Sequence, residues 1–214
     1  MEFPHKGKIM AAGYPFFGPA NSKTLQAQIK QEEYLEPTFS ELVSFIHRYF
    51  GEEGTKAAKI KEIMNTKYFV GFTGILYLPK KNEVYFKDRP VFASGSIVDV
   101  DNLESRLKLN EAHAKVSLDN LKTGTLPWDQ IPGHPLFIAI AGEEGAEKLA
   151  ELASKHRDKN GYIFLPDISN FTSPQARIPL LYSYQEGRSL TVSLNGAGYS
   201  TNSYSFGLLK DLPI

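Results

Sequence analysis

The stretch Tyr68–Pro79, YFVGFTGILYLP, is the longest apolar run in the chain. It is too short to span a bilayer and two glycines interrupt it, so it predicts a buried strand over Tyr68–Tyr77. A polar turn, Lys80-Lys81-Asn82, separates it from a second apolar-rich run, Glu83–Asp88. Two such runs joined by a short turn are typical of a β-hairpin.

Helices are predicted ahead of this hairpin. Thr38-Phe-Ser-Glu41 has the spacing of a capping box, in which the two polar side chains satisfy free amides at a helix start. Apolar residues at helical spacing follow it, and Gly51 stands where such a helix would end. Further helices are expected over about 23–34 and 56–65.

A β-α-β unit is predicted over about residues 135–166. Pro135–Gly142 (PLFIAIAG) reads as a buried strand, 143–157 as a helix and 162–166 as a second strand. That order favours parallel pairing with a right-handed crossover. Between the two regions, Ser96–Val100 is expected to be a short strand, and residues 101–121 carry both helical and strand signals.

The fold class expected is α+β or mixed α/β in one domain, residues 1–214. Helices fall mainly in the N-terminal third, and five or more strands form a mixed sheet. Residues 161–206 hold few charges and predict C-terminal antiparallel strands, with a hairpin around Glu186-Gly187. Residues 1–21 are rich in proline, glycine and large apolar side chains, which predicts an N-terminal arm packed on the domain or on a partner.

Composition excludes several classes of protein. Lys plus Arg number 24 and Asp plus Glu number 24, so no global field steers the chain to nucleic acid, and no nucleic-acid partner is expected. The absence of cysteine excludes disulfides, thiol nucleophiles and cysteine-ligated zinc. Proline and glycine break the apolar segment near the start, so no signal peptide and no membrane association are predicted, and a cytoplasmic protein is expected.

Two stretches resemble a family of uncharacterised archaeal proteins. One is Gly71–Lys80 with Asp88-Arg-Pro90 soon after it, and the other is Phe137–Glu151. The resemblance covers roughly residues 55–165. It implies an intracellular archaeal protein, and it brings no catalytic residues because no activity is assigned to the family.

Three aspartates are the candidate metal ligands. Asp99 and Asp101 end one predicted strand and Asp167 follows another, so the three would meet if these strands were parallel neighbours. Carboxylates in that arrangement can hold Mg²⁺. The alternative is that Asp101 caps the next helix and Asp99 is solvated. No other cofactor is predicted.

The remaining motifs do not predict a nucleotide-binding, zinc or nucleophile site. Ala141–Gly145 lies at a predicted strand-to-helix turn but lacks both nucleotide-binding fingerprints, and its glutamates would repel phosphate. None of the five histidines has the spacing of a zinc site, and there is no GxSxG nucleophile motif.

Tyr199, Tyr204 and Phe206 lie in a polar-aromatic run typical of recognition surfaces and equally of a strand with one wet face. The leading hypothesis for function is therefore a non-enzymatic binding or assembly module, with a protein partner or a second copy in a homodimer. The alternative is a metal-assisted hydrolase or transferase built on the three aspartates.

Overall fold

The centre of the fold is the strand β5, Thr73–Leu78, whose six residues are all buried. Its side chains alternate between two cores: Ile75 and Tyr77 pack in the larger one, and Leu76 and Leu78 pack in the smaller one on the other face. The description rests on a computed structural model and covers residues 1–93, 98–109, 111, 114–184, 187–196 and 201–209. A strand buried on both faces reads as a continuous apolar run, as this one does.

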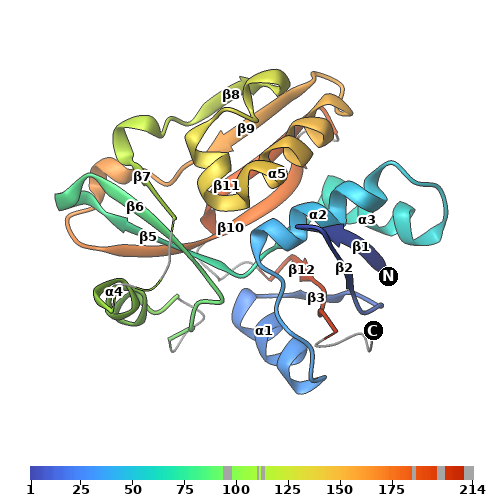
Figure 1. The fold of residues 1–214 in the computed structure, drawn as a ribbon, viewed down its shortest axis with the longest axis horizontal. Coiled ribbons are helices and arrows are strands. Elements are labelled where there is room, and N and C mark those ends of the chain that lie inside the picture. The colour runs from blue at the N-terminus through green and yellow to red at the C-terminus, as the bar shows by residue number, and fades with distance from the viewer. Residues whose placement is uncertain (94–97, 110, 112–113, 185–186, 197–200, 210–214) are drawn as a thin grey trace.

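Ten strands of the described residues form one mixed sheet (Figure 1). The order is β3–β12–β4–β10–β11–β9–β8, and β5 joins this path by pairing with β10 and β6, while β6 pairs with β7. The bounds are β3 Phe17–Ala20, β4 Tyr68–Val70, β6 Glu83–Asp88, β7 Ala114–Ser117, β8 Gly124–Pro127, β9 Asn160–Phe164, β10 Gln175–Tyr184, β11 Ser189–Gly196 and β12 Ser203–Ser205.

The two predicted hairpins are present. In β5–β6 the strands pair antiparallel up to Leu78 opposite Glu83, and Asn82 takes a left-handed conformation (φ 56°) in the turn. In β10–β11 the pairing is antiparallel up to Tyr184 opposite Ser189. Residues 185–186 of that second turn lie outside the described residues.

The described ranges contain five α-helices, which cover the two faces of the sheet (Figure 1). The larger core lies under α2 (Phe39–Phe50), α3 (Thr55–Thr66) and α5 (Pro135–Ser154), and the smaller core lies under α1 (Ser22–Gln31) and α4 (Val100–Lys108). This confirms an α+β fold in a single domain, with three of the five helices in the N-terminal third. None of the helices in the described ranges is long and apolar enough to cross a membrane.

The predicted capping box opens α2. The Thr38 hydroxyl accepts a hydrogen bond from the Glu41 amide (3.2 Å), and the Glu41 carboxylate accepts one from the Thr38 amide (2.6 Å). Residues 101–121 carried both helical and strand signals in the sequence. The structure contains both elements there, since α4 is followed by β7.

The predicted β-α-β unit is wrong, because Pro135–Ala141 forms the first part of α5 and not a strand. Leu136, Phe137, Ile140 and Ala141 are buried while Ile138 is 37% exposed, which is the spacing of one helix face. A short apolar run cannot separate a buried strand from a buried helix by period alone. The parallel partner of β9 is β11, and β8 pairs antiparallel on its other side.

The arm at residues 1–21 contributes three strands. β1 (Glu2–His5) and β2 (Lys8–Ala11) form a separate hairpin, and β3 pairs with β12 at the end of the main sheet. Phe3 is buried in the larger core beside Phe45, with ring centroids 5.5 Å apart. By contrast, Ile9 and Tyr14 are 61% and 46% exposed, so apolar composition alone did not predict burial for every residue of the arm.

His156 fastens the end of α5 to the sheet. Its Nδ1 lies 2.8 Å from the Leu152 carbonyl oxygen, which can only accept, so Nδ1 carries the proton. Its Nε2 then accepts from the Ser183 hydroxyl at 2.9 Å, and the ring stacks on Phe50. Burial lowers the pKa of His156 below 6.5 and outweighs the Leu152 contact, which raises it.

We therefore expect the free energy of unfolding to fall as the pH drops below about 6.5. In that range His156 is protonated in the unfolded chain and stays neutral in the folded chain. Burial also lowers the pKa values of His5 and His134, which adds to the same slope. The check is a series of melting temperatures between about pH 7.5 and pH 5.5. His156→Gln should flatten the series, and identical slopes for the two proteins would contradict this assignment.

Candidate functional site

The three predicted metal ligands do not form a metal centre. Asp99 caps α4 by accepting from the Asn102 amide (2.9 Å), and Asp101 lies in the first turn of that helix. Asp167 caps a short 3-10 helix, Ile168–Asn170, and also accepts from the Asn170 side-chain amide (2.6 Å). Across the described ranges, no group of three or more histidine, aspartate or glutamate residues could hold a metal ion.

The supposed strand adjacency explains the error. Of the predicted strand Ser96–Val100, residues 96–97 lie outside the described ranges, Val98 forms a single bridge to Phe92, and Val100 already belongs to α4. The strand before Asp167 is β9, and its neighbours are β8 and β11. The alternative capping interpretation was correct in kind, although Asp99 is the cap and Asp101 is not.

The predicted aromatic surface is not assembled either. Phe206 is fully buried, and its ring centroid lies 4.3 Å from that of Phe45 in the larger core. Tyr204 is half-buried in β12. Tyr199 lies outside the described residues. A strand with alternating burial, the other interpretation of this run, describes Ser203–Ser205.

A different surface gathers charged side chains from distant parts of the chain. It is a groove of about 580 Å³ where the end of β6 meets the start of α2, the middle of α5 and the β1–β2 turn. We call it the cationic groove. It is lined by Lys6, Ser40, Thr73, residues 86–89, Arg106, Ala114 and residues 138–142.

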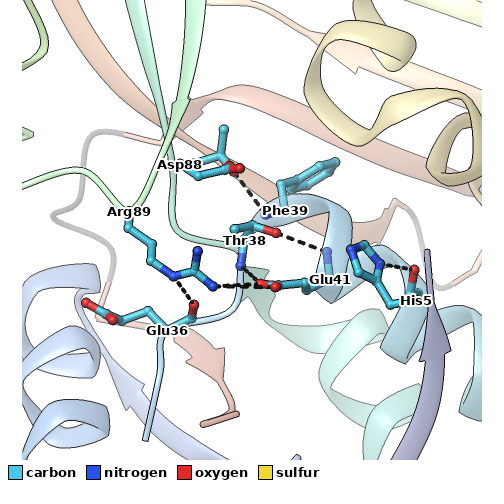
Figure 2. A network of polar contacts seen from close by, with 9 residues as sticks. His5, Glu36, Thr38, Phe39, Glu41, Asp88 and Arg89 are labelled. Atoms are coloured by element: carbon cyan, nitrogen blue, oxygen red, sulfur yellow. Dashed lines mark hydrogen bonds and ion pairs between the residues drawn. The ribbon is translucent and has the colours of Figure 1, made fainter. Parts of the chain in front are cut away.

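A polar network holds the floor of this groove (Figure 2). The Thr73 hydroxyl donates to Asp88 (2.6 Å), and the same oxygen accepts from the Phe39 amide (3.0 Å). The Arg89 guanidinium donates to the Glu36 carbonyl oxygen (3.2 Å) and to the Glu41 carboxylate (3.4 Å). The capping box of α2 is thereby tied to the end of β6.

Arg89 has a backbone conformation that is uncommon for its residue type. Its φ is 52°, in the left-handed region, which costs an L-residue about 1–2 kcal/mol. Its amide donates to the Phe72 carbonyl oxygen (2.7 Å), which holds the conformation in place. Strain of this kind clusters at ligand sites, where it sets the direction of a side chain.

A break in α5 forms the opposite wall. Gly142 has φ 77° and ψ 170°, so the helix stops and restarts there. Ser40 donates to the Ala141 carbonyl oxygen (2.6 Å), which the break leaves without its helical partner. A turn at Gly142 was expected from the sequence, although its neighbours proved to be helix on both sides. Ile138 and Ala139 on the first half of α5 give this wall an apolar surface.

The charge of the groove is predominantly positive. Four lining side chains are cationic (Lys6, Lys87, Arg89 and Arg106), and Asp88 is the one lining carboxylate among the described residues. Glu111 bridges Lys87 (3.0 Å) and Arg106 (2.9 Å), and hydrogen bonds from these two cations lower its pKa. In the part of the chain that the structure describes, the Lys6 ammonium group has no ion pair or hydrogen bond.

A serine next to the groove resembles a nucleophile but is closed to substrate. Ser44 Oγ lies 3.0 Å from His5 Nδ1 and 2.9 Å from Lys148 Nζ, and Lys148 also pairs with Glu144. Ser44 is buried, and burial lowers the pKa of His5. A nucleophile must reach the reacting atom, so this cluster attaches the β1–β2 hairpin to α2 and α5.

Sequence reasoning missed the groove. Two of its cations, Lys6 and Arg89, are 83 residues apart in the sequence (89 − 6), so no short sequence motif contains both. One signal was available: Asp88-Arg-Pro90 puts two opposite charges before a proline at the end of a predicted strand, where the chain must turn.

Comparison with known proteins shows a likeness in fold. No model of a protein family matches the chain, and no curated protein matches its sequence. A solved structure from work on the accommodation of massive sequence variation in Nanoarchaeota by the C-type lectin fold does match. The TM-score is 0.63 at 15% identity, over 94% of this chain and 98% of that one. At this identity the likeness shows the fold alone.

Proposed function

We propose that this chain is a non-enzymatic binding module that holds an acidic segment of a protein partner in the cationic groove. The observation that carries the proposal is the convergence of four cations on one groove with an apolar wall: Lys6 from the β1–β2 turn, Lys87 and Arg89 from the end of β6, and Arg106 from α4. Clefts lined by one sign of charge concentrate ligands of the opposite sign.

An acidic peptide fits this surface better than nucleic acid does. Asp88 would repel a phosphate chain, whereas its carboxylate can accept a backbone amide of a peptide. Ile138 offers an apolar contact beside the cations. Glu111 is itself 39% exposed, so solvent weakens its ion pairs with Lys87 and Arg106, and a partner carboxylate can take its place beside these two cations.

The structural neighbour supports a binding function in general terms. Its fold is described as accommodating massive sequence variation, and a scaffold that tolerates variation suits recognition better than fixed chemistry. Its Nanoarchaeota source also supports the archaeal origin that the resemblance over residues 55–165 implies. The cysteine-free composition fits a cytoplasmic location, which we include in the proposal.

The test compares Lys6→Glu with Lys8→Glu. Both positions lie on the β1–β2 hairpin and both changes reverse the same charge, but Lys8 does not line the groove. The probe is a fluorescein-labelled peptide of alternating glutamate and leucine, followed by anisotropy. Lys6→Glu should weaken binding about tenfold, which corresponds to about 1.4 kcal/mol, and Lys8→Glu should leave it nearly unchanged.

Three outcomes count against the proposal: no binding of the acidic peptide, equal loss in both variants, or equal affinity for a lysine–leucine peptide of the same length. A second copy of the chain is the other partner that the sequence suggested. A dimer in light scattering that Lys6→Glu dissociates and Lys8→Glu does not would make the groove a self-association site. In that case the proposal of an acidic segment from a different protein is wrong.

A further inference from the structure

A second cavity lies on the other side of α4. It has a volume of about 300 Å³ and is formed between the 3-10 helix Pro79–Lys81, which follows β5, and α4, with Pro174 ahead of β10. It shares no lining residue with the cationic groove. Arg106 faces the groove and Leu107 faces this cavity, as expected for consecutive helical residues about 100° apart.

The floor of this cavity is apolar. Leu78 is buried in the smaller core, Leu107 packs against that core, and Pro174 adds a third apolar surface. Ligand cavities typically combine such a floor with a few polar groups that fix orientation, and their volumes run from about 300 to 1,000 Å³. A volume at the small end of that range selects a small ligand.

The rim of this cavity is cationic. Lys80, Lys81 and Lys108 line it, and Glu104 is the one acidic side chain that joins them among the residues whose structure is described. Within the described residues none of the three lysines makes an ion pair or a hydrogen bond with another side chain or with the backbone. Lys108 lies in the last turn of α4, where a positive charge also complements the helix dipole. That role explains Lys108. Side-chain hydrogen bonds lower the pKa of Glu83 and the charge of Lys81 adds to this effect, but neither role explains Lys80.

We infer that this cavity binds a small amphipathic anion, a carboxylate on a short apolar chain. The apolar chain would lie on Leu78 and Leu107, and the carboxylate would lie among the three ammonium groups. A sugar or a free phosphate would leave the apolar floor uncovered. The inference does not depend on the peptide-binding proposal, because the two sites have no residue in common.

Isothermal titration calorimetry with decanoate is the test, with decan-1-ol and acetate as matched ligands. Decanol keeps the apolar chain without the charge, and acetate keeps the charge without the chain. Decanoate should bind at least about tenfold more tightly than either, because each lacks one of the two contacts. Equal affinity for decanoate and decanol, or for decanoate and acetate, would overturn the inference.

Two triple variants locate the binding. Lys80→Gln, Lys81→Gln and Lys108→Gln together remove the rim, and Lys8→Gln, Lys122→Gln and Lys155→Gln remove the same charge from exposed positions outside the cavity. The rim variant should lose about tenfold or more in decanoate affinity with only a slightly lower melting temperature, because Lys108 also complements the dipole of α4, and the control should lose almost no affinity. Equal losses would place the anion elsewhere and contradict the inference. The rim variant should still bind the glutamate–leucine peptide. That result would show that loss of decanoate binding and loss of peptide binding are independent, so the two proposals can fail separately.

Discussion

Replacing Phe206 with alanine should lower the free energy of unfolding by about 3–5 kcal/mol. Its ring is fully buried and contacts two others, with centroid distances of 4.3 Å to Phe45 and 6.2 Å to Phe3. These rings join the last strand, α2 and the N-terminal hairpin, so the cavity left by Phe206→Ala would loosen three segments at once. A loss of this size is a large share of the 5–15 kcal/mol typical of a domain.

Urea unfolding measures this loss, with Phe164→Ala as the matched control. Phe164 is 39% exposed on β9, so the same substitution there should cost much less. If the two variants lose equal stability, Phe206 is not a core residue, and its assignment to a recognition surface would return.

Gly71→Ala should also destabilise strongly, at or above the upper end of the 1–3 kcal/mol range for an overpacked site. A Cβ at Gly71 would lie 2.5 Å from Phe39 Cα and 2.8 Å from the Phe39 amide nitrogen. Both are backbone atoms at the start of α2, which cannot turn aside as a side chain can. The substitution should push the capping box away from the sheet and weaken the Arg89–Glu41 contact at the groove.

Thermal melting measures this effect, with Gly133→Ala as its control. Apart from its two chain neighbours, no described residue places a heavy atom within 4 Å of a Cβ built at Gly133, and its φ is not positive, so alanine should be nearly neutral there. A Gly71→Ala variant as stable as the wild type would mean that α2 does not approach the sheet this closely.

Local chemistry explains which parts of the fold were predictable. The capping box at Thr38 and Glu41, the β5–β6 hairpin and the β10–β11 hairpin each depend on residues close in sequence. The first half of α5 was not predictable, because Pro135–Ala141 is too short and too apolar for its period to separate helix from strand. Phe206 was misassigned because it follows a polar-aromatic strand, and only the packing of Phe3 and Phe45 around it decides its burial.

The groove was beyond sequence reasoning for a different reason. Its cations come from a hairpin turn, a strand end and a helix, and their convergence follows from the sheet order and not from spacing. The aspartate site failed on the same point, since its formation required two strands to be neighbours that the sheet keeps apart.

The measurement that tests the central claim most directly is an NMR titration of the ¹⁵N-labelled full chain with the glutamate–leucine peptide. The claim predicts amide shifts concentrated at Lys6, residues 86–89 and residues 138–142, which line three sides of the cationic groove. It also predicts that the shifts at these positions disappear in Lys6→Glu and persist in Lys8→Glu. Shifts confined to other surfaces, or none at a saturating peptide concentration, would contradict it.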